Sequence, residues 1–214
     1  MSRNCIVTAV SRRIGRVLLA GAFAAVAGTF AGCNTGGTSG PVNVPLTFRR
    51  GNAARIGGTI SASDVKVHIV PVEDQRDNKE QIGQNVEDEG AAPIPVYAAD
   101  KTPMEFYQAV IEDELNNFGL ELVEAPEAAD RIVSIELDRF WVEEGNNYRG
   151  EVQATAQVSD KGGRVLWKGK IPGDGKTFGR SRNPANYNLV LSDATRRSVS
   201  ALVNNPGFQQ ALTR

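Results

Sequence analysis

Few side chains in this sequence could act as nucleophiles, general bases or soft metal ligands. The 214 residues include one histidine, His68, and two cysteines, Cys5 and Cys33. A zinc site needs about four nitrogen, sulfur or oxygen ligands, and a catalytic triad needs a histidine beside its nucleophile. His68 falls on the polar side of a predicted strand, and no second histidine exists to complete either arrangement. We therefore interpret His68 as a structural side chain and predict no catalytic residue, no metal site and no enzyme activity.

Gly175, Lys176 and Thr177 match the end of a phosphate-binding loop, but the pattern is incomplete. The full motif requires a glycine where this chain has Lys170, and it opens a helix whose N-terminus faces the phosphate. No helix start follows Thr177 in the sequence. We therefore predict that the chain binds no nucleotide and no other cofactor.

Carboxylates gather in one polar segment, where Asp74, Asp77 and Glu80 lie close to Arg76. Oxygen ligands of this kind can hold Ca²⁺, but the Asp-x-Asp-x-Asp-Gly spacing of a specific calcium loop is missing. The sequence favours solvated charges, or an ion pair between Asp74 and Arg76 that fastens the loop. We predict a candidate interaction loop that includes Asp74, Arg76 and Asp77 and binds no metal.

The residues before Cys33 indicate a different chemistry. Four arginines precede an apolar run from residue 17 to residue 31, and the first acidic residue is Asp64. A basic segment, an apolar segment and small residues define a secretory signal. The run of fifteen residues is shorter than the about 20 that a transmembrane helix needs. An uncleaved N-terminal anchor is the alternative interpretation.

The end of this run resembles the lipobox of bacterial lipoproteins, in which an apolar residue and two small residues precede a modified cysteine. The four residues are Phe30, Ala31, Gly32 and Cys33, with Phe30 where leucine is usual. The resemblance implies cleavage between Gly32 and Cys33 and acylation of Cys33, with palmitate among the expected chains. Two or more acyl chains give stable anchoring to a membrane. An ordinary signal peptide, cleaved after an Ala-x-Ala site, is the alternative.

Cleavage at this site divides the chain into three predicted segments. Residues 1–32 are the signal peptide, residues 33–60 are the lipidated cysteine with a flexible tether, and residues 61–214 are a single domain. Glycine, serine and threonine dominate residues 34–41, and this composition is typical of flexible linkers.

The charge of the mature chain argues against a nucleic-acid partner. The signal peptide contains four of the 24 basic residues and none of the 25 acidic ones, which leaves a net charge of −5. Nucleic-acid binding needs a basic surface, and this net charge also disfavours a basic membrane-binding patch. With Cys5 removed and Cys33 acylated, no disulfide is available, so the hydrophobic core must stabilise the domain.

Hydrophobic periodicity predicts the elements of the first half of the domain. Residues 42–48 are a candidate first short strand, which Pro45 interrupts, and residues 64–72 alternate as in a half-buried strand. A helix over 102–117 begins with a capping box formed by Thr102 and Glu105, and a second strand-like segment covers 129–142. The strand, helix, strand order up to residue 123 predicts a βαβ unit.

The second half of the chain predicts a β-hairpin and two helices. Residues 149–159 alternate between apolar and polar side chains, and the glycines of a tight turn follow at 162 and 163. The return strand extends to Ile171, a loop covers 172–185, and helices cover 184–204 and 206–212. We predict an α+β fold: a single domain with a mixed, mostly antiparallel sheet, a βαβ unit and two main helices packed on the sheet.

Several short motifs between residues 60 and 212 resemble the YajG-like bacterial lipoproteins. These motifs are Val72-Glu73-Asp74-Gln75-Arg76, Ile82-Gly83, Phe118-Gly119, Ala129-Asp130, the helix segment 188–194 and Asn205-Pro206-Gly207-Phe208. More loosely, the chain resembles the auxiliary lipoproteins of ABC-type lipid transporters. The YajG-like resemblance implies an α/β domain and offers no catalytic residues to transfer.

Together these patterns predict a non-enzymatic, lipid-anchored lipoprotein of the cell envelope that binds a periplasmic or membrane protein. An auxiliary lipoprotein subunit of an ABC-type lipid-transport system is the alternative. The residue after Cys33 is Asn34, whereas aspartate at this position resembles the inner-membrane retention signal of Gram-negative lipoproteins. We therefore expect the anchor to lie in the outer membrane, with the domain facing the periplasm.

Overall fold

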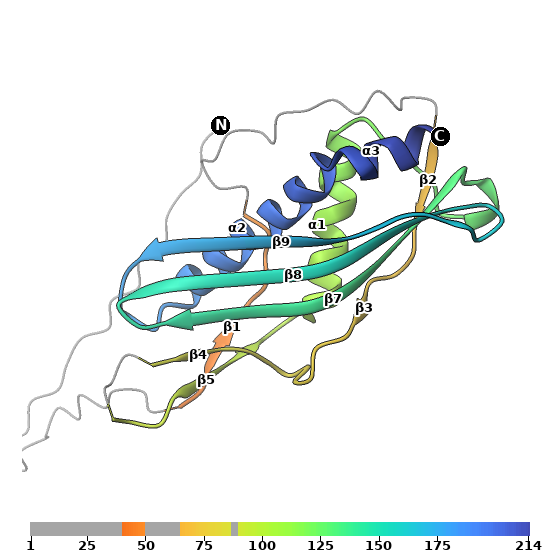
Figure 1. Cartoon of the computed structure of the whole chain (residues 1–214). Helices are drawn as coiled ribbons and strands as arrows, with labels where there is room; N and C mark the ends of the chain where they lie inside the picture. Colours follow the sequence, from red (N-terminus) through yellow and green to blue (C-terminus); the bar gives the residue numbers. More distant parts are fainter. Residues whose placement is uncertain (1–39, 50–64, 87–89) are drawn as a thin grey trace, which may run out of the picture. The chain divides into compact units, whose positions relative to one another are not determined.

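The computed structural model describes residues 40–49, 65–86 and 90–214 (Figure 1). The predicted signal peptide, the lipobox with Gly32 and Cys33, and most of the predicted tether lie outside these residues. Within the described part of the chain, no helix is both long enough and apolar enough to cross a membrane.

Three long antiparallel strands dominate the sheet. They are β7 (Arg131–Glu144), β8 (Asn147–Asp160) and β9 (Val165–Phe178), joined by short turns. The alternation predicted for β8 is confirmed, because Val152, Ala154, Ala156 and Val158 are all fully buried while their neighbours are partly exposed. The turn between β8 and β9 uses Gly163 at a positive φ of 80°, a conformation that glycine adopts without strain.

Shorter strands extend the sheet beyond β7 and make it mixed. Parallel to β7 run β2 (Lys66–Ile69), β3 (Glu73–Asp74) and β4 (Gln81–Asn85). Strand β5 (Ile94–Ala98) pairs antiparallel with β4, β1 (Val42–Val44) pairs parallel with β5, and β6 (Glu121–Leu122) pairs parallel with β2. The parallel β2–β6 pair, with a helix before β6, corresponds to the predicted βαβ unit.

Each helix begins where the sequence provides a cap. Helix α1 (Pro103–Asn117) has the predicted capping box, in which the Glu105 amide donates to Thr102 Oγ1 at 3.2 Å and the Thr102 amide donates to the Glu105 carboxylate at 2.8 Å. Helices α2 (Pro184–Val203) and α3 (Pro206–Thr213) likewise start with proline after a capping asparagine. A short 3₁₀ turn, η1, covers Pro126–Ala128.

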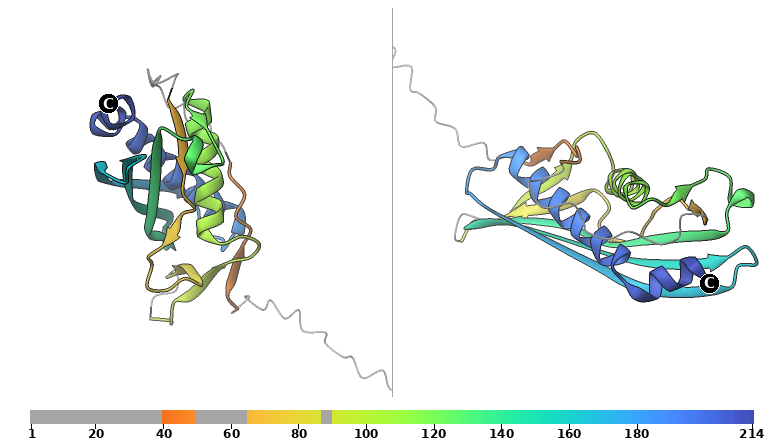
Figure 2. Two further views of the ribbon diagram at one scale, coloured as in Figure 1. Left: turned by 90° about the vertical axis from the view of Figure 1, so that its right-hand side faces the viewer. Right: turned by 90° about the horizontal axis from the view of Figure 1, so that it is seen from above.

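The helices cover one face of the long strands, and the opposite face is open to solvent (Figure 2). Helix α1 contacts β7 through Phe106, whose ring lies 5.9 Å from that of Phe140, and α3 contacts β9 through Phe208, 5.6 Å from Trp167. The result is a two-layer α+β domain, as the sequence predicts.

The domain begins earlier than the predicted boundary at residue 61. Val44 and Leu46 are fully buried, the Leu46 amide donates to Asp100 at 2.7 Å, and the Thr47 amide donates to Asn188 on α2 at 3.0 Å. Residues 42–49 are therefore part of the folded domain, and β1 falls within the short strand predicted over 42–48, although the predicted boundary assigned these residues to the tether. The glycine-rich composition of 34–41 does not continue into this segment, whose buried side chains stabilise the core.

Strand β9 is also longer than predicted, because it continues to Phe178 instead of ending at Ile171. Its glycines are sites of close packing. A Cβ atom on Gly173 would lie 2.0 Å from the Ala194 carbonyl oxygen, and one on Gly175 would lie 2.4 Å from that of Val190. The glycines let α2 approach the strand backbone, and Gly175-Lys176-Thr177 therefore lies in a strand and not in a phosphate-binding loop.

Candidate functional site

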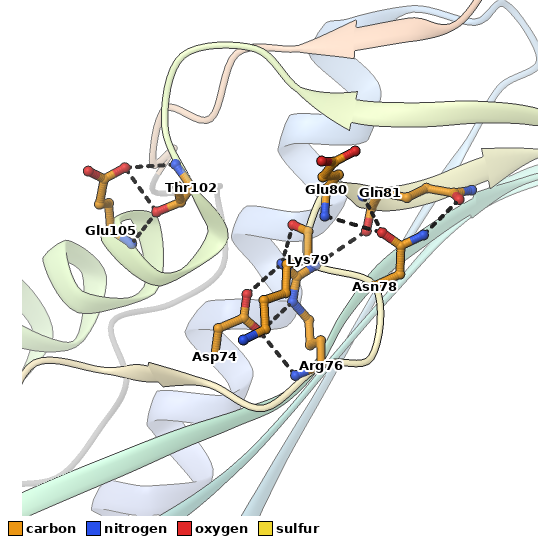
Figure 3. Close-up of polar contacts among 8 residues, drawn as sticks. All are labelled: Asp74, Arg76, Asn78, Lys79, Glu80, Gln81, Thr102 and Glu105. Carbon is orange, nitrogen blue, oxygen red and sulfur yellow. Dashed lines mark hydrogen bonds and ion pairs between the residues drawn. The ribbon is translucent and has the colours of Figure 1, made fainter.

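The candidate interaction loop connects β3 to β4 and is fastened by a buried ion pair (Figure 3). The guanidinium of Arg76 donates two hydrogen bonds to Asp74, from Nε at 2.9 Å and from an η nitrogen at 2.8 Å. Both side chains are about nine-tenths buried or more, at 6% and 5% exposure. Burial raises the pKa of Asp74, but the hydrogen bonds and charge of Arg76 outweigh this and lower the pKa below its usual range.

Arg76 also fixes the backbone of the loop. It donates to the carbonyl oxygens of Lys79 at 2.8 Å and Gln81 at 3.3 Å, while the Asn78 side chain accepts from the amides of Glu80 and Gln81. The exposed residues of the loop are Gln75 and the four residues from Asp77 to Glu80. Asp74 and Arg76 therefore support the loop, and Asp77 is the one member of the predicted set that faces solvent.

Arg76→Lys is expected to lower the free energy of unfolding by about 1–2 kcal/mol, because lysine keeps the charge but loses the planar fork that bonds Asp74 and two carbonyl groups. Urea denaturation measures the change. Arg139→Lys is the matched control, since Arg139 pairs with Glu151 at 2.5 Å on the open face with both side chains over 40% exposed. Exposed pairs contribute little, so the control should shift stability by less than about 0.5 kcal/mol. Equal losses of stability in the two variants would contradict the proposed role of the Asp74–Arg76 ion pair in holding the loop.

A second polar cluster surrounds Glu144, at the end of β7, where sequence reasoning predicted nothing. Its carboxylate is fully buried and accepts hydrogen bonds from the amides of Ser181 at 2.7 Å and Arg182 at 2.9 Å, and from the Tyr187 hydroxyl. Tyr148 packs edge-on against Tyr187 with ring centres 4.9 Å apart and accepts from the Asn183 amide. Glu144 thus ties the β9–α2 connection to the sheet.

The charge on Glu144 is stabilised by these donors. Burial raises the pKa of its carboxyl, but the hydrogen bonds from Tyr187, Tyr148 and the two amides lower it below the usual range. Burial and the neighbouring carboxylate raise the pKa of Tyr187, so the phenol keeps its proton and donates a hydrogen bond to Glu144. One feature of the sequence indicates this cluster. Glu144 comes two residues after Val142 and therefore falls on the apolar side of the alternation in β7.

His68 lies in an open groove between β2, α1 and β6. Its Nδ1 atom is 3.1 Å from the Val123 carbonyl oxygen, a contact that orients the ring. The groove has a volume of about 520 Å³ and includes Gln108, Glu112 and Leu122 in its lining. In the part of the chain that the structure describes, no three His, Cys, Asp or Glu side chains gather as metal ligands would. The contact with Val123 gives the His68 ring a backbone partner.

The fold defines the class of protein to which this chain is similar. No family model and no curated protein matches the sequence. The solved structure of protein XCC0632 from Xanthomonas campestris, described as DUF330, matches with a TM-score of 0.53 at 11% identity, over 78% of this chain and 96% of that chain. The two chains therefore share a fold.

Two further solved structures match with lower TM-scores. Lipoprotein GNA1162 from Neisseria meningitidis matches with a TM-score of 0.36 at 11% identity, over 55% of this chain and 87% of that chain. The PelC dodecamer from Paraburkholderia phytofirmans matches with a TM-score of 0.41 at 17% identity, over 69% and 94% of the two chains.

Proposed function

We propose that this protein is a non-enzymatic, lipid-anchored lipoprotein of the bacterial cell envelope that binds a protein partner. The observation that supports the proposed lipid anchor is the sequence Phe30-Ala31-Gly32-Cys33, which comes directly after an apolar run. The YajG-like resemblance of the mature domain supports the same class. Acylation of Cys33 and cleavage after Gly32 would leave a short tether before the buried residue Val42.

The loop from Asp77 to Glu80 is the surface that we propose for the partner. Its backbone is held by Arg76 and Asn78, so it is ordered before any partner binds. A preformed loop loses less conformational entropy on binding than a flexible one, which favours affinity. Asp77, Lys79 and Glu80 offer charges of both signs, which suits a polar protein surface.

The outer membrane is the proposed location, because Asn34 follows the acylated cysteine. The alternative role, an auxiliary subunit of an ABC-type lipid transporter, would place the partner in the inner membrane. A lipid-binding subunit is expected to have an enclosed apolar pocket. The groove at His68 is open, and its lining includes Gln108, Glu112 and Asn116. This favours the protein-binding role over the lipid-transport role.

Photo-crosslinking in intact cells tests the proposal. With a photoreactive residue at Asn78, we expect one discrete protein adduct that disappears in the Asp77→Arg variant and in the unlipidated Cys33→Ser variant. A photoreactive residue at Lys161, in the exposed β8–β9 turn, is the control and should not give this adduct. An intact mass without acyl chains would overturn the anchor, and an adduct that survives Asp77→Arg would overturn the loop assignment. Recovery with inner-membrane markers on a density gradient would favour the transporter role.

A further inference from the structure

The groove between β2, α1 and β6 lies at one edge of the sheet. Strand β6 pairs with β2, and no other strand of the described residues pairs with it. The volume of about 520 Å³ lies within the range of about 300–1,000 Å³ that ligand sites occupy. Four of the side chains that line the groove are apolar: Ile69, Pro71, Leu122 and Val123. The groove therefore presents an apolar surface that another chain can reach from the edge of the sheet.

Hydrogen bonds between the surrounding elements hold the walls of the groove in place. The side-chain oxygen of Gln108 on α1 accepts from the Val72 amide at 2.9 Å, and its side-chain nitrogen donates to Glu112 one turn further along the helix. The His68 ring on β2 contacts the Val123 carbonyl oxygen at 3.1 Å. Because these bonds join α1 to the chain after β2, and β2 to the chain after β6, the groove is formed before a partner binds. A preformed site loses less conformational entropy on binding.

The segment that supplies two of the three elements around the groove is strongly acidic. Residues 102–130, which include α1, β6 and η1, contain eight acidic residues and no lysine, arginine or histidine. The rest of the predicted mature chain has 20 basic and 17 acidic residues, which is a net charge of +3. The negative charge of the mature protein is therefore concentrated around the groove.

Two of these carboxylates line the groove without a basic partner. They are Glu112 on α1 and Glu124 after β6, and neither forms an ion pair with any residue that the structure describes. Lys66 on β2 is already paired with Glu121, at 3.6 Å. The bond from Gln108 occupies one oxygen of Glu112, and a carboxylate can accept several hydrogen bonds. The groove is therefore complementary to a segment that has both apolar and basic side chains.

We propose that the groove binds a basic, partly apolar segment of a protein partner. Apolar side chains of this segment pack against Leu122 and Val123, and its lysine or arginine side chains pair with Glu112 and Glu124. The acidic charge around the groove attracts such a segment before contact. The groove is a second binding surface, separate from the loop 77–80, and its function depends neither on that loop nor on the lipid anchor.

Two other occupants are less complementary to the groove. An anionic phospholipid would bring its phosphate close to Glu112 and Glu124, and its acyl chains would meet the polar side chains of Gln108 and Asn116. A second copy of this chain, docked groove to groove, would place two acidic segments 102–130 against each other. The charge around the groove therefore favours a basic segment over lipid and over self-association.

Fluorescence anisotropy with a labelled peptide tests the proposal. The probe is a peptide of about eight alternating lysine and valine residues, added to the full-length lipidated protein in a non-ionic detergent. An exposed ion pair contributes up to about fivefold in affinity. Glu112→Gln with Glu124→Gln should therefore weaken binding of the peptide about 5- to 25-fold. Glutamine keeps a side-chain oxygen that can accept from Gln108, so the wall of the groove stays in place.

Asp77→Asn with Glu80→Gln is the matched control. It makes the same change in net charge on the exposed loop and should alter the peptide affinity by less than about twofold at physiological salt, where distant charges are screened. Two control peptides separate the contributions of charge and apolar contact. Glutamate in place of lysine should abolish binding, and serine in place of valine should weaken it.

Crosslinking locates the bound peptide on the wild-type protein, independently of the variants. A photoreactive group at the centre of the lysine–valine peptide should crosslink to residues 68–71 or 108–124. Equal weakening by the loop variant, equal binding of the glutamate peptide, or crosslinks confined to other segments would overturn the groove assignment. Displacement of the peptide by dihexanoylphosphatidylcholine, or its exclusion when the protein dimerises, would also overturn it and would assign the groove to lipid or to a second copy. The loop proposal is decided separately, by the crosslink from Asn78.

Discussion

Glu144→Ala is expected to lower the free energy of unfolding by about 3–5 kcal/mol. The substitution leaves the Tyr187 hydroxyl and the amides of Ser181 and Arg182 buried without their acceptor, and each unsatisfied buried donor costs about 1–3 kcal/mol. Urea denaturation followed by tryptophan fluorescence measures the change. Glu143→Ala is the control, because the neighbouring Glu143 points to the open face and bonds Gln84. A control that loses as much stability as Glu144→Ala would show that the cluster has no special role.

Glu144 also determines in which direction the stability of the domain changes with pH. Its pKa is lower in the folded state than in the unfolded chain, where a glutamate titrates near about 4.3. Such a group contributes stability that is fully present above the unfolded pKa and is lost as pH falls through the folded pKa. The difference in stability between the wild-type protein and Glu144→Gln should therefore narrow below about pH 4.3. A constant difference from pH 7 to pH 3 would contradict the lowered pKa.

Gly173→Ala is expected to destabilise the domain by about 3 kcal/mol or more, although it adds a single methyl group. The new carbon would lie 2.0 Å from the Ala194 carbonyl oxygen and 2.4 Å from the Ser198 nitrogen. Both contacts are with the α2 backbone, so the helix must move away from β9, and overpacking of this kind costs about 1–3 kcal/mol or more. The midpoint of urea denaturation should fall accordingly.

Gly145→Ala is the matched control for this substitution. Its added carbon would meet only a Val86 side-chain methyl at 3.6 Å, an ordinary van der Waals distance. The control should change stability by less than about 0.5 kcal/mol, as surface substitutions usually do. If Gly173→Ala changed the stability as little as Gly145→Ala, this would contradict the close approach of α2 to β9.

Local signals in the sequence predicted the elements that depend on local physics. The capping box of Thr102 and Glu105, the strict alternation of β8 and the glycine turn after Asp160 need no information about distant residues. They predicted α1, the hairpin and the α+β class. The ion pair between Asp74 and Arg76 was also predicted, as one of two interpretations, because the two residues are close together in the chain.

Features that depend on distant partners were not predicted. Gly173 and Gly175 resemble loop residues until α2 is placed against them. Residues 42–48 alternate as a short strand would, but their pairing with β5 and their contact with α2 depend on residues far away in the chain. Glu144 lies on the apolar side of the β7 alternation, but its partners Tyr187 and the 181–182 amides come from a distant segment. In each instance the deciding contact joins segments that are far apart in the sequence.

The bond between Thr47 and Asn188 spans 141 residues, and this separation constrains the order of folding. During synthesis the N-terminal end of the chain appears first, and β1 then has neither β5 nor α2 to bind. Contacts of such high sequence separation form late, because loop closure must precede them. Strand β1 therefore remains unpaired until nearly the whole chain is available. If Cys33 is acylated as we propose, the modification can act on an unfolded substrate, and the last folding step would close β1 onto a domain already attached to lipid.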